Sequence, residues 1–379
     1  MKVGILTFHC AHNYGAMLQA YATQELLRGA GHQVEVIDYR PSYLTDPYRW
    51  FSLSRVRKAD GSFSIKHLLA ELCLLPVRYI RYARFDSFMT KRLNLSGRVR
   101  YESFTGDYVV IVIGSDQVWN LRQMNGRFDR MYLADFPFDK NSRRYVADAV
   151  SLEPDLVDST LKEELSCAIA RFDALSAREI DMVGWLDSLT TKKFVHIQDP
   201  VFHIDPHRWY QFASPVSRRR PYLLVYRMAK QDKIDPFISH LAEDLHIDIV
   251  EVQSSPEATK LFSYGQTVSV EDFLGLIANA AFVITSSFHG TAFSLIFRRQ
   301  FYYFTFGNNK DLRVKSLLES LDLTDRMLEP GASVAETGNI DYDEVDAKIS
   351  ILRKASAEFV LNAVSDMNGP SDACKVEKE

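Results

Sequence analysis

Three polar turns in this 379-residue chain carry side chains that could do chemistry. They are HCAHNYGAM at 9–17, GSDQVW at 114–119 and SSFHG at 286–290. Each turn comes where an apolar run ends and a helical pattern begins. In parallel α/β sheets, ligands bind at such strand ends, because helix N-termini there direct free N–H groups at anions. The three turns therefore predict a ligand site.

His289, in the third turn, is the residue best suited to proton transfer. An imidazole titrates near neutrality, so it can both donate and accept protons at physiological pH. Taken alone, His289 has an equally good structural interpretation, as a hydrogen-bonded histidine at a domain surface. Ser286 or Ser287 can cap the helix that begins here, and Gly290 lets a ligand approach the backbone.

The first two turns supply amide, hydroxyl and carboxylate groups, which can hydrogen-bond a polar ligand. A structural alternative exists here too, because Asn13, Ser115 and Asp116 can act as helix caps and Gly15 can ease a turn. The candidate ligand-binding residues in these turns are Asn13, Tyr14, Gly15, Ser115, Asp116 and Gln117.

The elements that must position these turns alternate along the chain. Short runs rich in Val, Ile and Tyr are followed by longer helical patterns, which is typical of strands and helices around parallel sheets. We expect strands at 2–8, 33–39, 108–114, 144–150 and 174–177, and again at 222–228, 247–252, 281–285 and 301–306. The first helix is expected at 16–31.

The predicted fold class is therefore α/β, with two successive units, each built on a parallel sheet. The N-terminal domain is expected at 1–198 and the C-terminal domain at 199–340. A C-terminal helix at 341–367 could return to the N-terminal domain, and a flexible tail is expected at 368–379.

Three motifs in this order resemble the polysaccharide pyruvyl transferase family: NYGAMLQAYA at 13–22, VIGSDQVWN at 112–120 and SSFHGTAFSLIF at 286–297. The resemblance implies a GT-B-like fold of two Rossmann-like domains facing a cleft that holds the active site. The N-terminal domain would bind the acceptor, a sugar, through the candidate residues of the first two turns, and the C-terminal domain would bind the donor. It also implies that pyruvate passes from phosphoenolpyruvate to two hydroxyls of a sugar, as a cyclic ketal, in a cell-surface polysaccharide or its lipid-linked precursor. No cofactor is expected beyond this co-substrate.

The resemblance also assigns residues to the donor. It makes His289 the catalytic acid and base, or a group that stabilises the leaving phosphate. SAREIDMVGWL at 176–186 places Arg178 on the donor, and GNNKDLRVKSLL at 307–318 adds Lys310 and Arg313. Ser287 and Gly290 complete the expected donor site. The chain departs from the family at Asp148, where serine is usual, and this carboxylate is assigned to the acceptor side.

Other partners are disfavoured by composition. The formal net charge of −4 gives no general attraction to nucleic acid. The four cysteines form no CxxC pair, so neither a disulfide framework nor a zinc cluster is expected: Cys10, Cys73, Cys167 and Cys374. His9 and His12 flank Cys10 without further ligands nearby, and HIDPH at 203–207 is better explained as an interdomain loop, so no metal site is expected.

The sequence shows no secretory signal at Met1, and we expect a cytoplasmic protein. The segment at 64–93 has leucines at helical spacing, a break at Pro76 and a basic cluster, Arg78, Arg81 and Arg84. A basic face could rest on the inner face of a membrane, although an interior helix pair with a solvated basic edge is the favoured interpretation. A GT-B-like glycosyltransferase using a sugar nucleotide and a silent glycan-binding protein are the functional alternatives.

Overall fold

The computed structural model describes residues 1–57, 61–140, 143–218, 220–229, 232–256, 264–332 and 338–365. Two parallel sheets organise these residues. The tail expected at 368–379, and Cys374 within it, lie outside them.

The N-terminal sheet has six parallel strands in the order β2-β1-β3-β4-β5-β6. They are β1 (Lys2–Leu6), β2 (Gln33–Val36), β3 (Val110–Asp116), β4 (Arg144–Val150), β5 (Ala174–Ala177) and β6 (Val195–His196). The central strand β3 is buried along its apolar length, VIVIG, because it has a neighbour on each side and helices over its faces. Strand β6 has only two residues and was not expected from the sequence.

The C-terminal sheet has five parallel strands in the order β11-β10-β9-β7-β8. They are β7 (Tyr222–Arg227), β8 (Asp248–Gln253), β9 (Phe282–Thr285), β10 (Phe301–Phe304) and β11 (Met327–Leu328). Every strand expected in this half is present, and β11 is a further short one. The α/β class with two parallel-sheet, Rossmann-like domains is therefore confirmed, in the arrangement expected of a GT-B-like protein.

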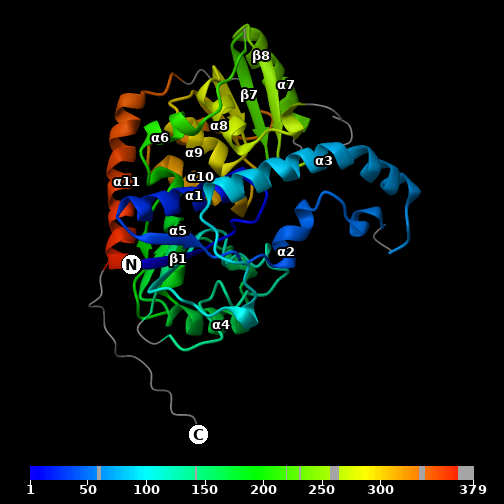
Figure 1. Cartoon of the computed structure of the whole chain (residues 1–379). Helices are drawn as coiled ribbons and strands as arrows, with labels where there is room; N and C mark the ends of the chain where they lie inside the picture. Colours follow the sequence, from blue (N-terminus) through cyan, green and yellow to red (C-terminus); the bar gives the residue numbers. More distant parts are fainter. Residues whose placement is uncertain are drawn as a thin grey trace.

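Helices connect the strands and cover the sheets (Figure 1). The N-terminal set is α1 (Tyr14–Gly29), α2 (Ser42–Thr45), α3 (Ile65–Arg92), α4 (Ser159–Ile169) and α5 (Ile180–Asp187). The later set is α6 (Pro206–Phe212), α7 (Asp235–Asp244), α8 (Val270–Ala278), α9 (Phe288–Ile296), α10 (Leu312–Glu319) and α11 (Tyr342–Ser365). Helix α1 starts two residues earlier than expected, because the Asn13 side chain accepts hydrogen bonds from the first-turn amides.

Helix α3 corrects two expectations. It is one continuous helix, not a pair broken at Pro76, which lies on its exposed side, where water can solvate the backbone carbonyl that proline leaves unbonded. Its arginines do not form a free basic face. Arg78 pairs with the buried Glu71, whereas Arg81 and Arg84 donate to backbone carbonyls of the C-terminal domain.

The last helix, α11, runs along both domains at one side of the molecule (Figure 1). Near its start, the Tyr342 hydroxyl donates to carbonyls at the end of α9 and just beyond it. Further on it contacts β4, and Ser356 accepts a hydrogen bond from the Gln198 amide. The chain thus returns from the C-terminal domain to the N-terminal sheet. None of the described helices is long and apolar enough to cross a membrane.

Candidate active site

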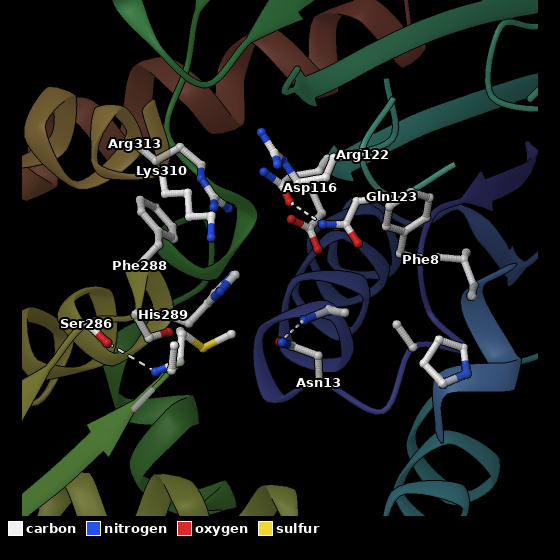
Figure 2. A pocket seen from close by; sticks show the side chains of 18 of the residues that line it. Phe8, Asn13, Asp116, Arg122, Gln123, Ser286, Phe288, His289, Lys310 and Arg313 are labelled. Atoms are coloured by element: carbon white, nitrogen blue, oxygen red, sulfur yellow. Dashed lines mark hydrogen bonds between the residues drawn. The ribbon is translucent and has the colours of Figure 1, made fainter. Parts of the chain in front are cut away.

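A cavity of about 400 Å³ lies where the two domains face each other (Figure 2). Its walls come from the carboxyl ends of strands in both sheets, together with the segment that follows β2. All three polar turns identified in the sequence reach it. The predicted site residues that line it are Asn13, Asp116, Gln117, Ser287, His289, Lys310 and Arg313.

His289 occupies the first turn of α9 and lies against the start of α1. A Cβ atom added to Gly15 would be 1.9 Å from the His289 Nδ1 atom, so the glycine is required for this approach. Helix α9 itself is capped by Ser287, whose hydroxyl accepts from the Gly290 amide. Gly290 is close-packed against the side chains of Thr285 and Tyr226, so its missing side chain serves packing within the domain.

Asp199 lies behind His289, and the sequence did not mark it as a site residue. Its Oδ2 atom is 3.6 Å from His289 Nε2 and 2.6 Å from Arg178 Nη1. Burial opposes ionisation of this carboxyl, but His289, Arg178 and the Val201 amide together hold its pKa below the usual range. The contact directs Nε2 of the imidazole toward a fixed negative charge.

Arg178 is buried and does not line the cavity, contrary to the expectation that it grips the donor. Its guanidinium lies among three carboxylates, at 2.6 Å from Asp199, 3.5 Å from Asp116 and 3.6 Å from Glu179. Although burial acts against its charge, these carboxylates raise the pKa of Arg178. Arg178 is therefore already neutralised and connects the cavity-lining Asp116 to the carboxylate beside His289.

Lys310 and Arg313 line the cavity on the side of the C-terminal domain (Figure 2). Among the residues that the structure describes, no carboxylate forms a salt bridge with either cation, although Asp116 and Glu179 act on the charge of Arg313 from a longer distance. The Lys310 ammonium lies 5.4 Å from the centroid of the Phe306 ring. Burial, followed by the positive charge of Arg178, lowers the pKa of Arg313. Both cations are thus available to an anion.

The opposite wall carries polar groups from the N-terminal domain (Figure 2). Asn13 both caps α1 and lines the cavity, so the structural and functional interpretations hold together for it. Asp116 adopts a left-handed backbone conformation, with φ of 74°, at the end of β3. Beyond it, Arg122 pairs with Glu153 at 2.7 Å, and Gln123 donates to Gln117 at 3.2 Å.

Besides Gly15, which lies against His289 and does not line the cavity, three residues expected to contact the acceptor are buried away from it. The Tyr14 hydroxyl donates to the Val268 carbonyl, and its ring stacks on Phe273 of α8 at 4.3 Å, which makes it an interdomain contact. The Ser115 hydroxyl donates to the Ala149 carbonyl within the sheet. Asp148 lies beneath α1, where Thr23 donates to it. Direct acceptor contact is therefore not supported for these three.

Asp148 has an unusual protonation environment. Burial, and to a smaller extent the negative charge of Asp199, raises the pKa of this carboxyl to about 7. The hydrogen bond from Thr23 acts in the opposite direction and lowers the pKa. Its Oδ1 atom has no hydrogen-bond partner. A protonated Asp148 is neutral and has an O–H donor, as does the serine that the family resemblance implies at this position.

The cavity also contains residues that sequence reasoning missed. The segment after β2, which has no periodic sequence pattern, contributes Tyr43, Leu44, Pro47 and Tyr48. Arg122 and Glu153 follow β3 and β4, and position after a strand is the signal that could have found them. Asp199 follows the two-residue β6, which was too short to recognise.

The histidines considered as metal ligands have other partners. His9 is 3.1 Å from Asp38, and His203 hydrogen-bonds the Gln198 carbonyl. His12 lies among aromatic rings, where burial, reinforced by Arg81 and Arg40, lowers its pKa to about 3. Within the described part of the chain, no group of three or more His, Cys, Asp or Glu side chains could hold a metal ion.

Solved structures similar to this one are distant in sequence. The glycosyltransferase of Streptomyces sp. SF2575, complexed with thymidine diphosphate, has 13% identity over 96% of this chain and 100% of its own, with a TM-score of 0.42. The UDP-GlcNAc 2-epimerase of Methanocaldococcus jannaschii has 11% identity over 96% and 99%, with a TM-score of 0.47. No curated protein matches the chain significantly.

A family comparison is more specific. The sequence model of polysaccharide pyruvyl transferases matches residues 13–308, which include the first polar turn from Asn13 onward, the other two turns and most of both domains. The match begins at the Asn13 cap and reaches the loop before Lys310. The chain belongs to the polysaccharide pyruvyl transferase family.

Proposed function

We propose that the protein is a ketal pyruvyltransferase, which moves pyruvate from phosphoenolpyruvate onto two hydroxyls of one sugar in a cell-surface polysaccharide or its lipid-linked precursor. One observation carries the proposal. In a member of this family, Lys310 and Arg313 line the same cavity as His289, and no described carboxylate forms a salt bridge with either of them. Phosphoenolpyruvate brings the matching groups, a phosphate and a carboxylate beside a carbon that must accept a proton.

Lys310 and Arg313 would bind the two anionic groups of the donor. An arginine can grip a phosphate or carboxylate with two parallel hydrogen bonds, and a lysine adds a compact charge. A bound anion would also offset the burial that lowers the pKa of Arg313. Arg178, which the sequence suggested for this role, would act as a positioning residue through Asp199.

The proposed chemistry begins with addition across the enol double bond. A sugar hydroxyl attacks C2 of phosphoenolpyruvate and loses its proton, while C3 gains a proton and becomes a methyl group. A second hydroxyl of the same sugar then displaces phosphate at C2, loses its proton and closes the ketal. The products are the pyruvylated sugar and inorganic phosphate. Phosphoenolpyruvate supplies both the pyruvyl group and the leaving group, so the reaction uses no further cofactor.

His289 would donate the proton to C3 and accept one from a hydroxyl. General acid and base catalysis by a positioned imidazole contributes about 10²- to 10⁴-fold in rate. Asp199 would hold the imidazole through its Nε2 atom. The other ring nitrogen, Nδ1, lies on the side of α1, close to Gly15. Asn13, Asp116 and Gln117, on the opposite wall, would receive the acceptor hydroxyls.

The function is tested by phosphate release. The protein is incubated with phosphoenolpyruvate and a panel of glycans, and the products are analysed for a mass gain corresponding to a pyruvyl ketal. A parallel series replaces phosphoenolpyruvate with sugar nucleotides, because the same cleft could hold a diphosphate. Turnover only with sugar nucleotides would establish the glycosyltransferase alternative and refute the proposal.

Donor binding can be tested separately from turnover. Phosphoenolpyruvate should raise the melting temperature of the wild type, since a ligand that binds only the native state stabilises it. Replacing both Lys310 and Arg313 with Ala should remove that rise. Lys315→Ala is the matched control, because Lys315 lies on α10 but pairs with Glu319 outside the cavity. An unchanged rise in the double variant would exclude these cations from the donor site.

A further inference from the structure

Helix α3 has a second apolar face that no described residue covers. Along its first four turns the exposed side chains recur at helical spacing, on the side opposite the one packed on the body. The segment before the helix adds to this surface, and the Trp50 ring lies 6.3 Å from that of Tyr79. We call this surface the α3 patch; it comprises Trp50, Leu53, Phe63, Ile65, Leu69, Leu72, Tyr79 and Ile80.

The α3 patch is prominent in shape. The N-terminal half of α3 and the segment that precedes it extend well beyond the two domains at one side of the molecule (Figure 1). Its large apolar residues are strongly exposed, with Ile65 at 69%, Leu53 at 63% and Phe63 at 60%. A contiguous apolar surface of this kind on a soluble part of a protein marks a site of association.

Charge decides which partner fits. Across 46–57 and 61–80 the chain carries five cations, Arg49, Arg55, Arg57, Lys66 and Arg78, against two carboxylates, Asp46 and Glu71. Glu71 is buried and already paired with two of the arginines. Arg49 pairs with Asp46, which leaves Arg57 and Lys66, both exposed, without a carboxylate partner among the described residues. Two copies packed face to face would bring like charges together, whereas an anionic lipid surface would neutralise them.

The position of the α3 patch relates it to the cavity. Pro47 and Tyr48 line the cavity wall, and Trp50 of the patch follows two residues later. A surface resting on a bilayer through the patch would therefore hold this wall of the cavity close to the headgroups. An acceptor sugar attached to a lipid carrier could then enter the cavity while its carrier stays in the bilayer.

We infer that the α3 patch docks the protein on an anionic lipid bilayer, with its aromatic and aliphatic side chains in the interface and its cations at the headgroups. The docking itself does not depend on the reaction. The further statement, that it serves a lipid-linked acceptor, rests on the proposed function.

Vesicle flotation tests the docking with the full chain. The wild type should float with vesicles of mixed phosphatidylcholine and phosphatidylglycerol, and less with phosphatidylcholine alone or at high salt. A variant combining Ile65→Ser and Leu69→Ser should partition onto the vesicles at least about tenfold less, because it lacks two aliphatic side chains that would be buried in the bilayer interface. Ile351→Ser is the matched control, since Ile351 is 70% exposed on α11, away from the patch.

Two results would overturn the inference. One is a wild type that does not float, or a double variant that floats equally well. The other is a wild-type dimer in solution that the double variant converts to a monomer, which would assign the patch to a second copy. Turnover of a short water-soluble acceptor should be the same in both proteins, with a loss only for an acceptor carried by vesicles. If no acceptor is turned over, the proposed function fails, while flotation still decides the docking.

Discussion

His289 owes its environment to residues from both domains. Gly15 gives it space, and Asp199 faces its Nε2 atom at 3.6 Å. This arrangement suits a side chain that exchanges protons with a ligand, since a carboxylate behind an imidazole fixes the orientation of the ring and stabilises the imidazolium.

We expect His289→Gln to lower turnover by about 10²-fold or more, because glutamine keeps a polar side chain of similar reach but does not titrate. Donor binding should persist, since Lys310 and Arg313 are unchanged. Steady-state phosphate release and the thermal shift with phosphoenolpyruvate measure the two effects. Full activity in a folded His289→Gln protein would rule out the acid–base role, and loss of folding would indicate a structural histidine.

Asp148 gives a prediction about pH. An aspartate in the unfolded chain ionises near pH 4, whereas burial raises the native pKa of Asp148 to about 7. Between these values the native state keeps a proton that the unfolded state has lost, so this group reduces stability as pH rises and has no further effect above the native pKa. Asp148→Asn, which cannot ionise, should add about 2–4 kcal/mol to the unfolding free energy at pH 8.

The same substitution should change stability little at pH 4, where the native carboxyl is protonated and the asparagine oxygen can still accept from Thr23. Urea unfolding at the two pH values makes the comparison. A gain of equal size at both would show that packing, not ionisation, distinguishes the two side chains.

At the scale of elements, the start of α1 contacts the start of α9. This contact brings the wall proposed to bind the acceptor next to His289, the proposed acid and base. Gly15→Ala should displace the His289 ring or the first turn of α1, because the new Cβ would overlap the imidazole. Displacement of a reacting group by about 1 Å can cost 10²-fold in rate, and we expect a loss of that order in kcat.

Gly29→Ala is the control for that prediction. Gly29 ends the same helix, has no heavy atom within 4 Å of an added Cβ, and should tolerate alanine with unchanged turnover. Equal kcat in both variants, with His289 intact, would mean that the close contact has no catalytic consequence.

The elements also show what the sequence could predict. Strands β1, β3, β7 and β9 were recognisable because buried parallel strands are continuous apolar runs. The turns after β1, β3 and β9 then located Asn13, Asp116 and His289 by a general rule of α/β sheets.

Other features depend on tertiary contacts. Strands β6 and β11 have two residues each, too few to produce a pattern. Asp199 follows β6, at the position where the sequence predicts the boundary between the two domains. Arg178 follows a strand as an anion ligand should, but its charge is neutralised by the adjacent Glu179 and by two carboxylates, Asp116 and Asp199, from other parts of the sequence. A helical pattern also shows that α3 has apolar faces without telling which face packs on the body.

At the scale of the whole molecule, α3 links the two domains beside the cavity. Arg81 donates to the Tyr14 hydroxyl and to the carbonyls of Gln253, Ser254 and Gln266, at 2.8–3.4 Å. These acceptors lie in buried or half-buried surroundings, where an unsatisfied carbonyl costs about 1–3 kcal/mol. Arg81 therefore contributes to holding the C-terminal domain at a fixed position relative to α1.

We expect Arg81→Met, which keeps much of the side-chain volume, to lower the unfolding free energy by about 2–4 kcal/mol and to make the domains unfold less cooperatively. Differential scanning calorimetry should show a lower or split transition, accompanied by reduced turnover. Lys91→Met provides the control, since Lys91 is exposed near the end of the same helix. A melting profile identical to that of the wild type would show that Arg81 does not couple the domains.

The absence of a side chain at Gly15 has an evolutionary consequence. Because a Cβ at this position and the imidazole of His289 would occupy the same space, neither position can change freely while the other is kept. Relatives that have lost this histidine should be free to carry alanine or serine at the position of Gly15, whereas relatives that retain it should keep glycine. An alignment of the family would then separate proton-transferring members from silent ones by a pair of positions that are 274 residues apart in this chain (289 − 15).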